Sequence, residues 1–357
     1  MSRVLVTGAS GFIGTHLVRA LAEQGEVVTC LVRPSSIVAP LETLGVHLYS
    51  GDVTDVDCLR RAVAGQDVVY HLAGRTRAVG ARQYYAVNER GARAVAEACA
   101  AQGSPPVLVS VSSLAAAGPS TADQPHTETD PLRPISHYGR SKRAGELAVA
   151  AVADRVPATI VRPPIVFGEY DWLGFPLFAS VARFGVQALP SRSHPRFSMI
   201  HIADLVTLLI AAARAGQRLD PRLQRCRAPQ AAAESADCDT EESSACFAKG
   251  CYYASAGQDV TLGEFSRMIG QALGRRYTLL LPAPSPVTWS IAAAMELFSR
   301  IARRPVSLNL DKAREATAGS WTCSSGKAAA ELGFQPAAPL RQRIEQTVQW
   351  YREAKWI

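Results

Sequence analysis

The sequence predicts an α/β protein: a doubly wound parallel sheet followed by a smaller, mostly helical lobe. From the N-terminus to "ATIVRPPIVFG" at 158–168, short apolar runs alternate with helical patterns. Continuous apolar strands separated by helices are typical of a parallel sheet, because crossover helices cover both of its faces. Beyond residue 168 the alternation loosens into shorter, mainly helical elements.

The elements of the first half follow one another in a regular order. The expected helices cover 12–24, 56–64, 83–101 and 138–153, and the expected strands are "RVLVTG", "EVVTCLV", "VHLYSGD", "DVVYHLAG", "PVLVSVSS" and "ATIVRPPIVFG". Farther on, "FSMIHIADLVTLLIAAARA" predicts a strand and an apolar helix, and "VTLGEFSRMIGQALG" predicts an amphipathic helix. We therefore expect a sheet domain over 1–165, to which later strands and helices return, and a second lobe over 166–357.

One segment interrupts the second lobe. Residues 221–249, "PRLQRCRAPQAAAESADCDTEESSACFAK", contain few large apolar groups and shift from basic to acidic. Such a composition cannot bury enough surface to offset the entropy lost on ordering. We expect a mobile surface insertion there.

The composition excludes several classes of protein. The 357 residues are 48% hydrophobic, and no uncharged apolar stretch approaches the roughly 18 residues of a membrane span. The chain enters a strand pattern at once, with no room for a signal peptide, so we expect a cytoplasmic protein. The net charge of +7 is dispersed, so no nucleic-acid partner is expected. The eight cysteines form no C-x-x-C pair, which favours reduced thiols and no metal site.

Three glycines, Gly8, Gly11 and Gly14, lie between the first strand and the first helix. In this arrangement one glycine permits a tight turn, another lets backbone N–H groups approach a pyrophosphate, and a third packs helix against strand. The N-terminus of the helix then faces the anion. The loop therefore predicts a dinucleotide site.

The G-x-x-G-x-x-G spacing, "SGDVTD", "HLAG" and "YYAVNERGARAVAEAC" together resemble the extended branch of the short-chain dehydrogenase/reductase superfamily, the NAD-dependent epimerase/dehydratase family. The resemblance implies a Rossmann fold with a C-terminal substrate lobe. It also implies that Asp52 contacts the adenine, that the "HLAG" segment lies beside the adenine ribose, and that Asn88 belongs to the site.

Arg33 bears on the choice of dinucleotide. An NAD-selective site has an acidic side chain at the end of the second strand, and that carboxylate would repel a 2′-phosphate. Here "TCLVRPSS" supplies Arg33, Ser35 and Ser36 instead, a cation and hydroxyl groups suited to a phosphate. NADP is therefore favoured. The alternative is that Arg33 stacks on the adenine and that NAD is accepted as well.

Tyr138 and Lys142 are four residues apart, which on a helix places them on one face. They match the family's Y-x-x-x-K motif, and the adjacent ammonium is expected to stabilise the tyrosine phenolate. Ser113 lies 25 residues before Tyr138 and five before Gly118, as the family's catalytic hydroxyl does. Ser112 is expected to form a structural hydrogen bond, although the two serines could be reversed.

The resemblance implies a catalytic set and a cofactor set. The catalytic set is Ser113, Tyr138, Lys142 and Asn88. The cofactor set combines the glycine loop, three strand ends, the catalytic helix and "VRPPIVFG": Gly8, Ser10, Gly11, Phe12, Ile13, Gly14, Arg33, Asp52, Val53, Leu72, Ala73, Gly74, Tyr138, Lys142, Pro163 and Ile165. In the implied reaction Ser113 hydrogen-bonds the substrate oxygen, Tyr138 transfers the proton, and the nicotinamide exchanges hydride with the carbon.

The expected substrate is a small apolar ketone or secondary alcohol. Pro164 and Phe197 occupy positions where nucleotide-sugar enzymes of the family usually have asparagine and arginine. The "RPP" form and the C-terminal segment resemble the 3β-hydroxysteroid dehydrogenase and dihydroflavonol reductase group instead. A nucleotide-sugar epimerase or dehydratase, and a non-catalytic NADP-binding regulatory protein, are the alternatives.

Two further surfaces are expected to meet partners. The segment 286–305, "PVTWSIAAAMELFSRIARRP", has an apolar stripe with arginines at its end. We expect an apolar substrate lid, weak contact with a membrane surface, or ordinary core packing. The helices near 83–101 and 138–153 are alanine-rich on faces that one sheet cannot fully cover. Together with the family resemblance, these faces predict a homodimer.

Overall fold

The computed structural model describes residues 1–357 except 122, 191–193 and 226–246. Its main sheet has seven strands in the order β11-β6-β5-β4-β1-β2-β3, and every neighbouring pair is parallel. The strands are β1 (Arg3–Thr7), β2 (Val27–Val32), β3 (His47–Ser50), β4 (Val68–His71), β5 (Val107–Val111), β6 (Ala158–Arg162) and β11 (Cys251–Tyr253). The strand order reverses between β1 and β4, and ligands of open α/β sheets bind outside the carboxyl ends of strands at such a point.

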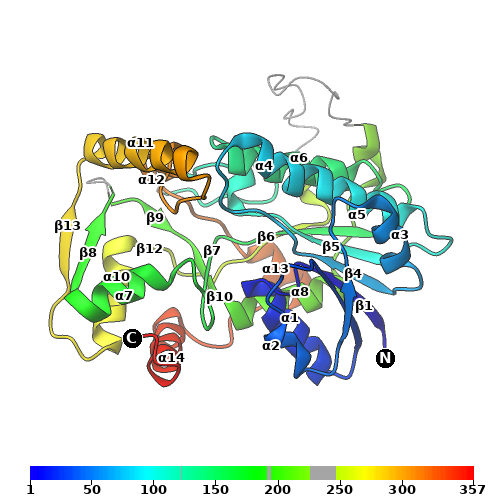
Figure 1. The fold of residues 1–357 in the computed structure, drawn as a ribbon, viewed down its shortest axis with the longest axis horizontal. Coiled ribbons are helices and arrows are strands. Elements are labelled where there is room, and N and C mark those ends of the chain that lie inside the picture. Colours follow the sequence, from blue (N-terminus) through cyan, green and yellow to red (C-terminus); the bar gives the residue numbers. More distant parts are fainter. Residues whose placement is uncertain (122, 191–193, 226–246) are drawn as a thin grey trace.

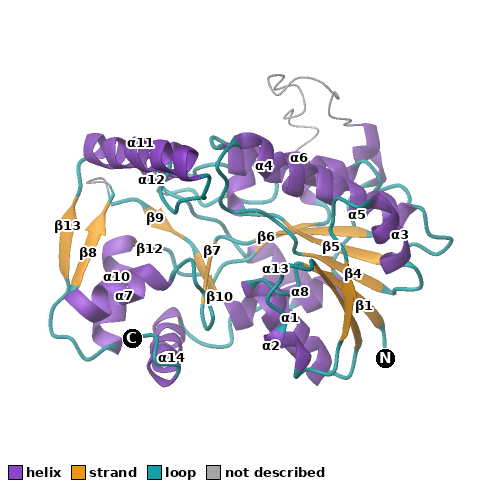
Figure 2. Ribbon diagram, in the orientation of Figure 1, coloured by secondary structure: helices purple, strands orange, loops and turns teal. Residues whose placement is uncertain are grey.

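Helices cover both faces of the main sheet, so the predicted doubly wound architecture is confirmed (Figures 1 and 2). One face carries α3 (Val56–Val63), α4 (Ala81–Tyr85), η1 (Ala86–Gly91), α5 (Ala92–Ala100) and α6 (His137–Ala150). The other carries α1 (Phe12–Glu23), α2 (Ala39–Glu42), α8 (Ile202–Ala215) and α13 (Gly326–Leu332). Each face has its own buried cluster of aliphatic side chains.

The second lobe consists of short paired strands and helices. The pairs are β7 (Ile165–Phe167) with β10 (Met199–His201), β8 (Val186–Leu189) with β13 (Leu279–Pro282), and β9 (Arg196–Phe197) with β12 (Val260–Thr261). The helices are α7 (Phe175–Phe184), α10 (Leu262–Ala272), α11 (Ser285–Ala302), α12 (Leu310–Thr317) and α14 (Leu340–Glu353). Two short helices, η2 (Leu114–Ala116) and η3 (Pro221–Arg225), pack against α6 instead. An aromatic cluster that includes Phe167, Phe178, Phe265 and Tyr351 forms the core of this lobe.

Three elements from beyond residue 165 pack with the main sheet: α8, β11 and α13. The chain thus returns to the sheet after it has entered the second lobe. The division at residue 165 stays a prediction.

The predicted insertion over 221–249 has a buried side chain near each end, and its mobility stays a prediction. Leu223 and Phe247 are buried in the core beneath α5 and α6, and the guanidinium of Arg143 lies 4.2 Å from the centroid of the Phe247 ring. These two residues are among the few large apolar groups of the segment, so burying them stabilises its flanks. The remaining part of the predicted insertion, 226–246, lies outside the described residues.

The alanine-rich faces of α5 and α6 are covered within one chain. Ala94, Ala98 and Ala148 are all buried beneath their neighbours. The premise that one sheet leaves these faces uncovered was therefore wrong. The homodimer itself stays a prediction.

Candidate active site

The glycine loop brings the start of α1 against the ends of β1 and β4. Gly8 has φ of 71°, and a Cβ added to it would lie 2.7 Å from the backbone nitrogen of Ala73. A Cβ on Gly14 would lie 2.1 Å from the carbonyl oxygen of Gly8. Side chains at these two positions would separate the loop, the helix and β4. The structure therefore requires glycine where the sequence predicts a pyrophosphate cradle.

A cleft of about 430 Å³ opens over this loop at the carboxyl ends of β1, β2 and β4. The predicted cofactor residues that line it are Gly8, Ser10, Gly11, Arg33, Asp52, Val53, Leu72, Ala73 and Gly74. Ser36, which the sequence predicts beside the 2′-phosphate, lines the cleft as well. The sequence reasoning missed several other lining residues: Leu31, Gly51, Arg75, Thr76, Arg77 and Val87. Because Arg75 and Arg77 directly follow "HLAG", their charge beside a strand end could have identified them.

Phe12 and Ile13 lie behind the cleft. Both form the first turn of α1 and pack against the aliphatic cluster of that face of the sheet. Their side chains thus hold the helix, while the helix N-terminus faces the cleft. Any contact with a cofactor would therefore involve the backbone N–H groups of Phe12 and Ile13, and this contact stays a prediction.

Arg33 lies exposed at the rim of the cleft, in a turn that β2 leads into. Its backbone N–H donates to Ser36 Oγ (3.1 Å), and the Ser36 N–H donates to its carbonyl (2.9 Å). Across the cleft, Asp52 Oδ1 accepts hydrogen bonds from the backbone and hydroxyl of Thr54. The described rim therefore offers a cation, where an NAD-selective site offers a carboxylate.

Arg33→Asp should reverse the preference between NADP and NAD. The change deletes a charge-assisted contact and sets a carboxylate against the 2′-phosphate, while NAD gains an acceptor for its ribose hydroxyls. A hydrogen bond to a charged group contributes about 1.5 to 3 kcal/mol, so the ratio of the two Kd values should shift at least roughly tenfold. Titration of both cofactors measures it, with Arg60→Asp in the exposed part of α3 as a charge-matched control. An unchanged ratio would mean that Arg33 only stacks on the adenine.

The N-terminus of α6, the helix that bears Tyr138, is capped by a carboxylate that is distant in the sequence. Ser136 Oγ accepts from the Gly139 N–H (2.9 Å), and the N–H groups of His137 and Tyr138 donate to the Asp311 carboxylate at 2.7 and 3.1 Å. An anion at a helix N-terminus is stabilised by the helix dipole. Asp311 belongs to α12, so the second lobe fixes the start of the catalytic helix. The sequence reasoning missed this residue, which is 173 positions from Tyr138.

Ser113 and Tyr138 meet where η2 and α6 approach each other closely. A Cβ on Gly139 would lie 2.2 Å from the carbonyl oxygen of Ala115, so only glycine permits this approach. Burial raises the pKa of Tyr138 to about 12, although a hydrogen bond with Ser113 acts in the opposite direction. Tyr138 therefore holds its proton at neutral pH in the chain without cofactor.

Lys142 is buried and held by a backbone carbonyl. Its Nζ donates to the carbonyl of Val111 (2.7 Å), and burial lowers its pKa to about 8. Burial, with a smaller contribution from Lys142, also lowers the pKa of His71 to about 3, and the Nδ1 of this neutral imidazole lies 2.8 Å from Thr7 Oγ1. The ammonium is thus anchored at the end of β5, and its stabilisation of the tyrosine phenolate stays a prediction.

The burial of Lys142 predicts a pH-dependent stability. Between about pH 8 and pH 10 the folded protein has lost the lysine proton, while the unfolded chain, with a pKa near 10.4, keeps it. Since the unfolded state then binds more protons, stability rises with pH. Relative to Lys142→Met, the wild-type free energy of unfolding should increase by about 2 kcal/mol from pH 7 to pH 10, at about 1.4 kcal/mol per pKa unit. Urea titrations of both proteins without cofactor test this. A constant difference between them would contradict the assignment.

Asn88 lies in η1, a π-helical turn inside the predicted 83–101 helix. Its Nδ2 donates to the Arg75 carbonyl (3.0 Å) and to Ser141 Oγ (2.9 Å), and its Oδ1 accepts from the Arg75 N–H (2.7 Å). Asn88 thus ties the loop after β4 to the residue preceding Lys142. Such turns are frequent at functional sites. This geometry indicates positioning, and a direct catalytic role for Asn88 stays a prediction.

A buried ion pair lies one helical turn beyond Lys142. Arg162 Nε and Nη2 donate to the two carboxylate oxygens of Glu146 at 2.8 and 2.9 Å, and both side chains are almost completely buried. Burial raises the pKa of Glu146, but the attraction of Arg162 outweighs it and the net pKa is lowered. Ser112 is buried beside Glu146, whereas Ser113 faces Tyr138, so the geometry favours Ser113 as the catalytic hydroxyl.

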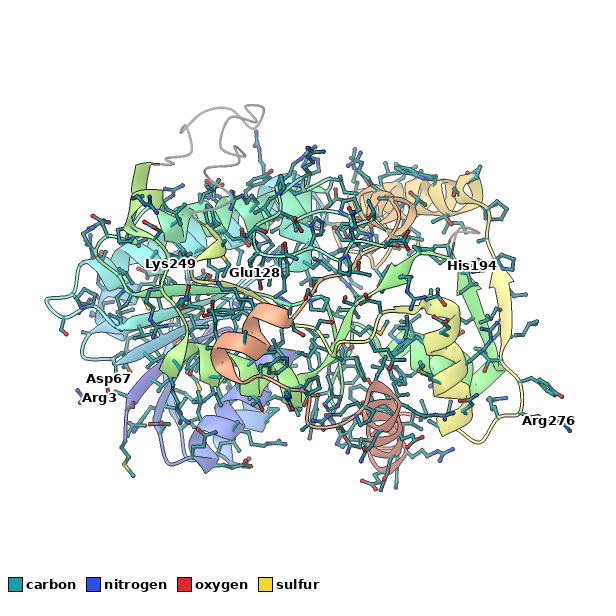
Figure 3. All side chains as sticks on the ribbon, turned by 180° about the vertical axis from the view of Figure 1, so that it is seen from behind. Arg3, Asp67, Glu128, His194, Lys249 and Arg276 are labelled. Atoms are coloured by element: carbon teal, nitrogen blue, oxygen red, sulfur yellow. The ribbon has the colours of Figure 1, made fainter. Side chains whose placement is uncertain are left out.

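A second buried carboxylate lies near this pair. Glu128 is buried and accepts a hydrogen bond from the Tyr253 N–H of β11 (2.9 Å), and Figure 3 labels its position among the side chains. Burial raises the pKa of Glu128. The sequence reasoning did not predict that Glu146 and Glu128 would lie buried near Arg162.

A second cavity, of about 360 Å³, opens beside Tyr138. It is mostly apolar, and its lining residues are Ser113, Leu114, Ala115, Tyr138, Pro164, Ile165, Phe197, Leu308, Lys312, Glu315, Ala316 and Trp321. Lys312 Nζ lies 2.6 Å from Glu315 Oε2 and 4.6 Å from the centroid of the Tyr138 ring. The cavity thus combines apolar walls with one ion pair next to the tyrosine.

Two residues predicted to contact the cofactor lie at this second cavity or beneath it. Ile165 lines the cavity beside Tyr138, and the Pro163 carbonyl accepts from the Leu114 N–H (2.9 Å), which joins β6 to η2. Their contact with the nicotinamide end stays a prediction.

Comparison with known proteins gives a consistent assignment. The model of the NAD dependent epimerase/dehydratase family matches residues 4–222. The chain is 33% identical to ceramide reductase of Caulobacter vibrioides over 99% of its length and 96% of the relative. It is 26% identical to 3 beta-hydroxysteroid dehydrogenase/Delta 5-->4-isomerase of Mycobacterium tuberculosis over 98% of its length and 90% of the relative. A dTDP-glucose 4,6-dehydratase of Streptomyces venezuelae, solved with NAD, shares the fold with a TM-score of 0.73 and 21% identity, covering 99% of this chain and 98% of that one.

Proposed function

Because the chain belongs to the NAD dependent epimerase/dehydratase family, we propose that it transfers hydride between a nicotinamide cofactor and a lipid-like ketone or secondary alcohol. The observation that supports this most is the position of Ser113 and Tyr138. Both line the apolar cavity, and Lys142 on the same helix lies beside Gly74 of the glycine-loop cleft. The catalytic groups therefore stand between a dinucleotide site and an apolar substrate site.

The residues present fit a dinucleotide. Gly8 and Gly14, where a Cβ would collide with neighbouring backbone, let the loop, α1 and β4 approach closely, and the N-terminus of α1 faces the cleft over this loop. When bound, the reduced nicotinamide would supply the hydride. Arg33 at the rim supports NADP as the proposed form, with NAD as the alternative.

In the reducing direction, Tyr138 acts as the general acid. Its phenol is protonated at neutral pH and donates the proton to the oxygen that gains negative charge. Ser113 donates a hydrogen bond to the same oxygen, and such a preoriented donor stabilises charge as it develops. In the oxidising direction the same groups act in reverse. Lys142, held by the Val111 carbonyl, presents its ammonium at the end of the cleft.

The apolar cavity favours a lipid-like substrate over a nucleotide sugar. Its described walls carry one ion pair, Lys312 with Glu315, and no cluster of arginines for a diphosphate. The names of two relatives, ceramide reductase and 3 beta-hydroxysteroid dehydrogenase, refer to lipids. A substrate that is largely apolar matches these walls.

A substrate panel tests the proposal. NADPH absorbance should fall with ketosteroids or long-chain ketones and stay constant with nucleotide sugars. An epimerase would convert its sugar without net oxidation of NADPH, and a regulatory protein would bind NADPH but turn over none of the panel. Either of these results would replace the proposal with the corresponding alternative.

A further inference from the structure

Helix α11 lies on the outside of the second lobe (Figure 1). Several of its large apolar side chains are exposed and form a stripe. Val287, Ile291, Phe298 and Ile301 recur at helical spacing and are 46%, 48%, 63% and 75% exposed. Side chains at this spacing share one face of a helix. The alternative expectation, that this stripe is core packing, is therefore wrong.

The buried face of α11 has the opposite character. Thr288, Ala292 and Ser299 are buried there, and the two hydroxyl groups donate to the carbonyls of Pro190 (3.2 Å) and Arg304 (2.6 Å). A surface helix in water normally turns its large apolar residues inward. Here small and polar residues face inward while large apolar residues face outward, so the exposed face is suited to an apolar environment.

Basic residues flank one end of the stripe. Arg300, Arg303 and Arg304 are exposed at the C-terminal end of α11, and Arg303 caps the helix with φ of 51°. Arg300 pairs with Glu296, whose other carboxylate oxygen accepts from the Leu310 N–H of α12 (3.1 Å). This contact joins α11 to the helix that supplies Lys312 and Glu315 to the apolar cavity.

We propose that the α11 face, defined as Val287, Ile291, Phe298, Ile301, Arg303 and Arg304, docks on the surface of an anionic lipid bilayer. The apolar side chains would enter the boundary between headgroups and acyl chains, and the arginines would lie against lipid phosphates. No helix in the described part of the chain is long and apolar enough to span a bilayer. Docking through this face would hold the apolar cavity near the source of lipid-like substrates.

Vesicle co-sedimentation of the full chain tests this proposal without cofactor or substrate, so its outcome is independent of the proposed reaction. The chain should sediment with vesicles of phosphatidylcholine and phosphatidylglycerol, and less with phosphatidylcholine alone. Replacing Arg303 and Arg304 with glutamine should lower the partition coefficient about fivefold for each arginine, since each contributes about 1 kcal/mol.

The apolar variants supply the matched comparison. Phe298→Ser combined with Ile301→Ser should reduce vesicle binding at least about tenfold. Phe184→Ser, which changes a 74% exposed phenylalanine of α7, should leave binding unchanged. The arginine variants test the proposal even if the double apolar variant fails to fold. The proposal is overturned if anionic vesicles retain no protein, if all variants bind equally, or if the apolar variants abolish self-association instead, which would make a second copy the occupant.

Discussion

Tyr138→Phe should lower kcat for ketone reduction by about two to four orders of magnitude, which is the usual contribution of a general acid or base. The substitution removes only the hydroxyl that hydrogen-bonds Ser113 and faces the apolar cavity. The ring that packs near Tyr84 remains, at 6.0 Å between centroids, so the fold should be preserved.

Steady-state kinetics with NADPH and an accepted ketone measure this loss. The Kd for NADPH and the thermal midpoint serve as controls, and both should stay close to the wild-type values. A variant that keeps most of the wild-type turnover would show that another group transfers the proton.

Glu146→Gln should reduce the free energy of unfolding by about 3 to 5 kcal/mol. The change keeps the shape of the side chain but leaves the buried Arg162 guanidinium without its bidentate carboxylate. Removing one partner of a buried pair is costly because the other charge stays desolvated. Since Glu146 also favours the charged form of Lys142, the variant should lower the pKa of that lysine further.

Urea denaturation measures the change in stability. Glu345→Gln is the matched control, because Glu345 forms an ion pair with Arg341 on the exposed surface of α14. Exposed pairs contribute at most about 1 kcal/mol, so the control should remain close to wild type. If the free energy of unfolding falls by the same small amount in both variants, the buried pair does not hold the sheet and the catalytic helix together.

The sequence predicted the parts of this molecule that depend on local patterns. The parallel sheet follows from continuous apolar strands, the cradle from three glycines, and the Tyr138–Lys142 face from helical spacing. The proximity of Ser113 and Tyr138 was predicted as well, but from the resemblance to a family and not from a local pattern.

Contacts made across the chain could not be predicted in this way. Asp311 caps the catalytic helix from 173 residues away, and Lys312 reaches the same tyrosine from the second lobe. Phe247 is buried in the cluster beneath α5 and α6 and packs against Arg143, contacts that its own segment of the sequence does not specify. The pKa of Lys142 depends on burial and on a backbone carbonyl, neither of which a motif specifies.

Deuteride transfer from NADPH that carries deuterium at both C4 positions tests the proposed function most directly. With an accepted lipid-like ketone, mass spectrometry should find one deuterium on the carbinol carbon of the product. Tyr138→Phe should slow this labelling by the same factor as turnover. An alcohol without deuterium, or a ketone panel that is never reduced while NADPH binds normally, would contradict the assignment of Ser113, Tyr138 and Lys142 to hydride-transfer chemistry.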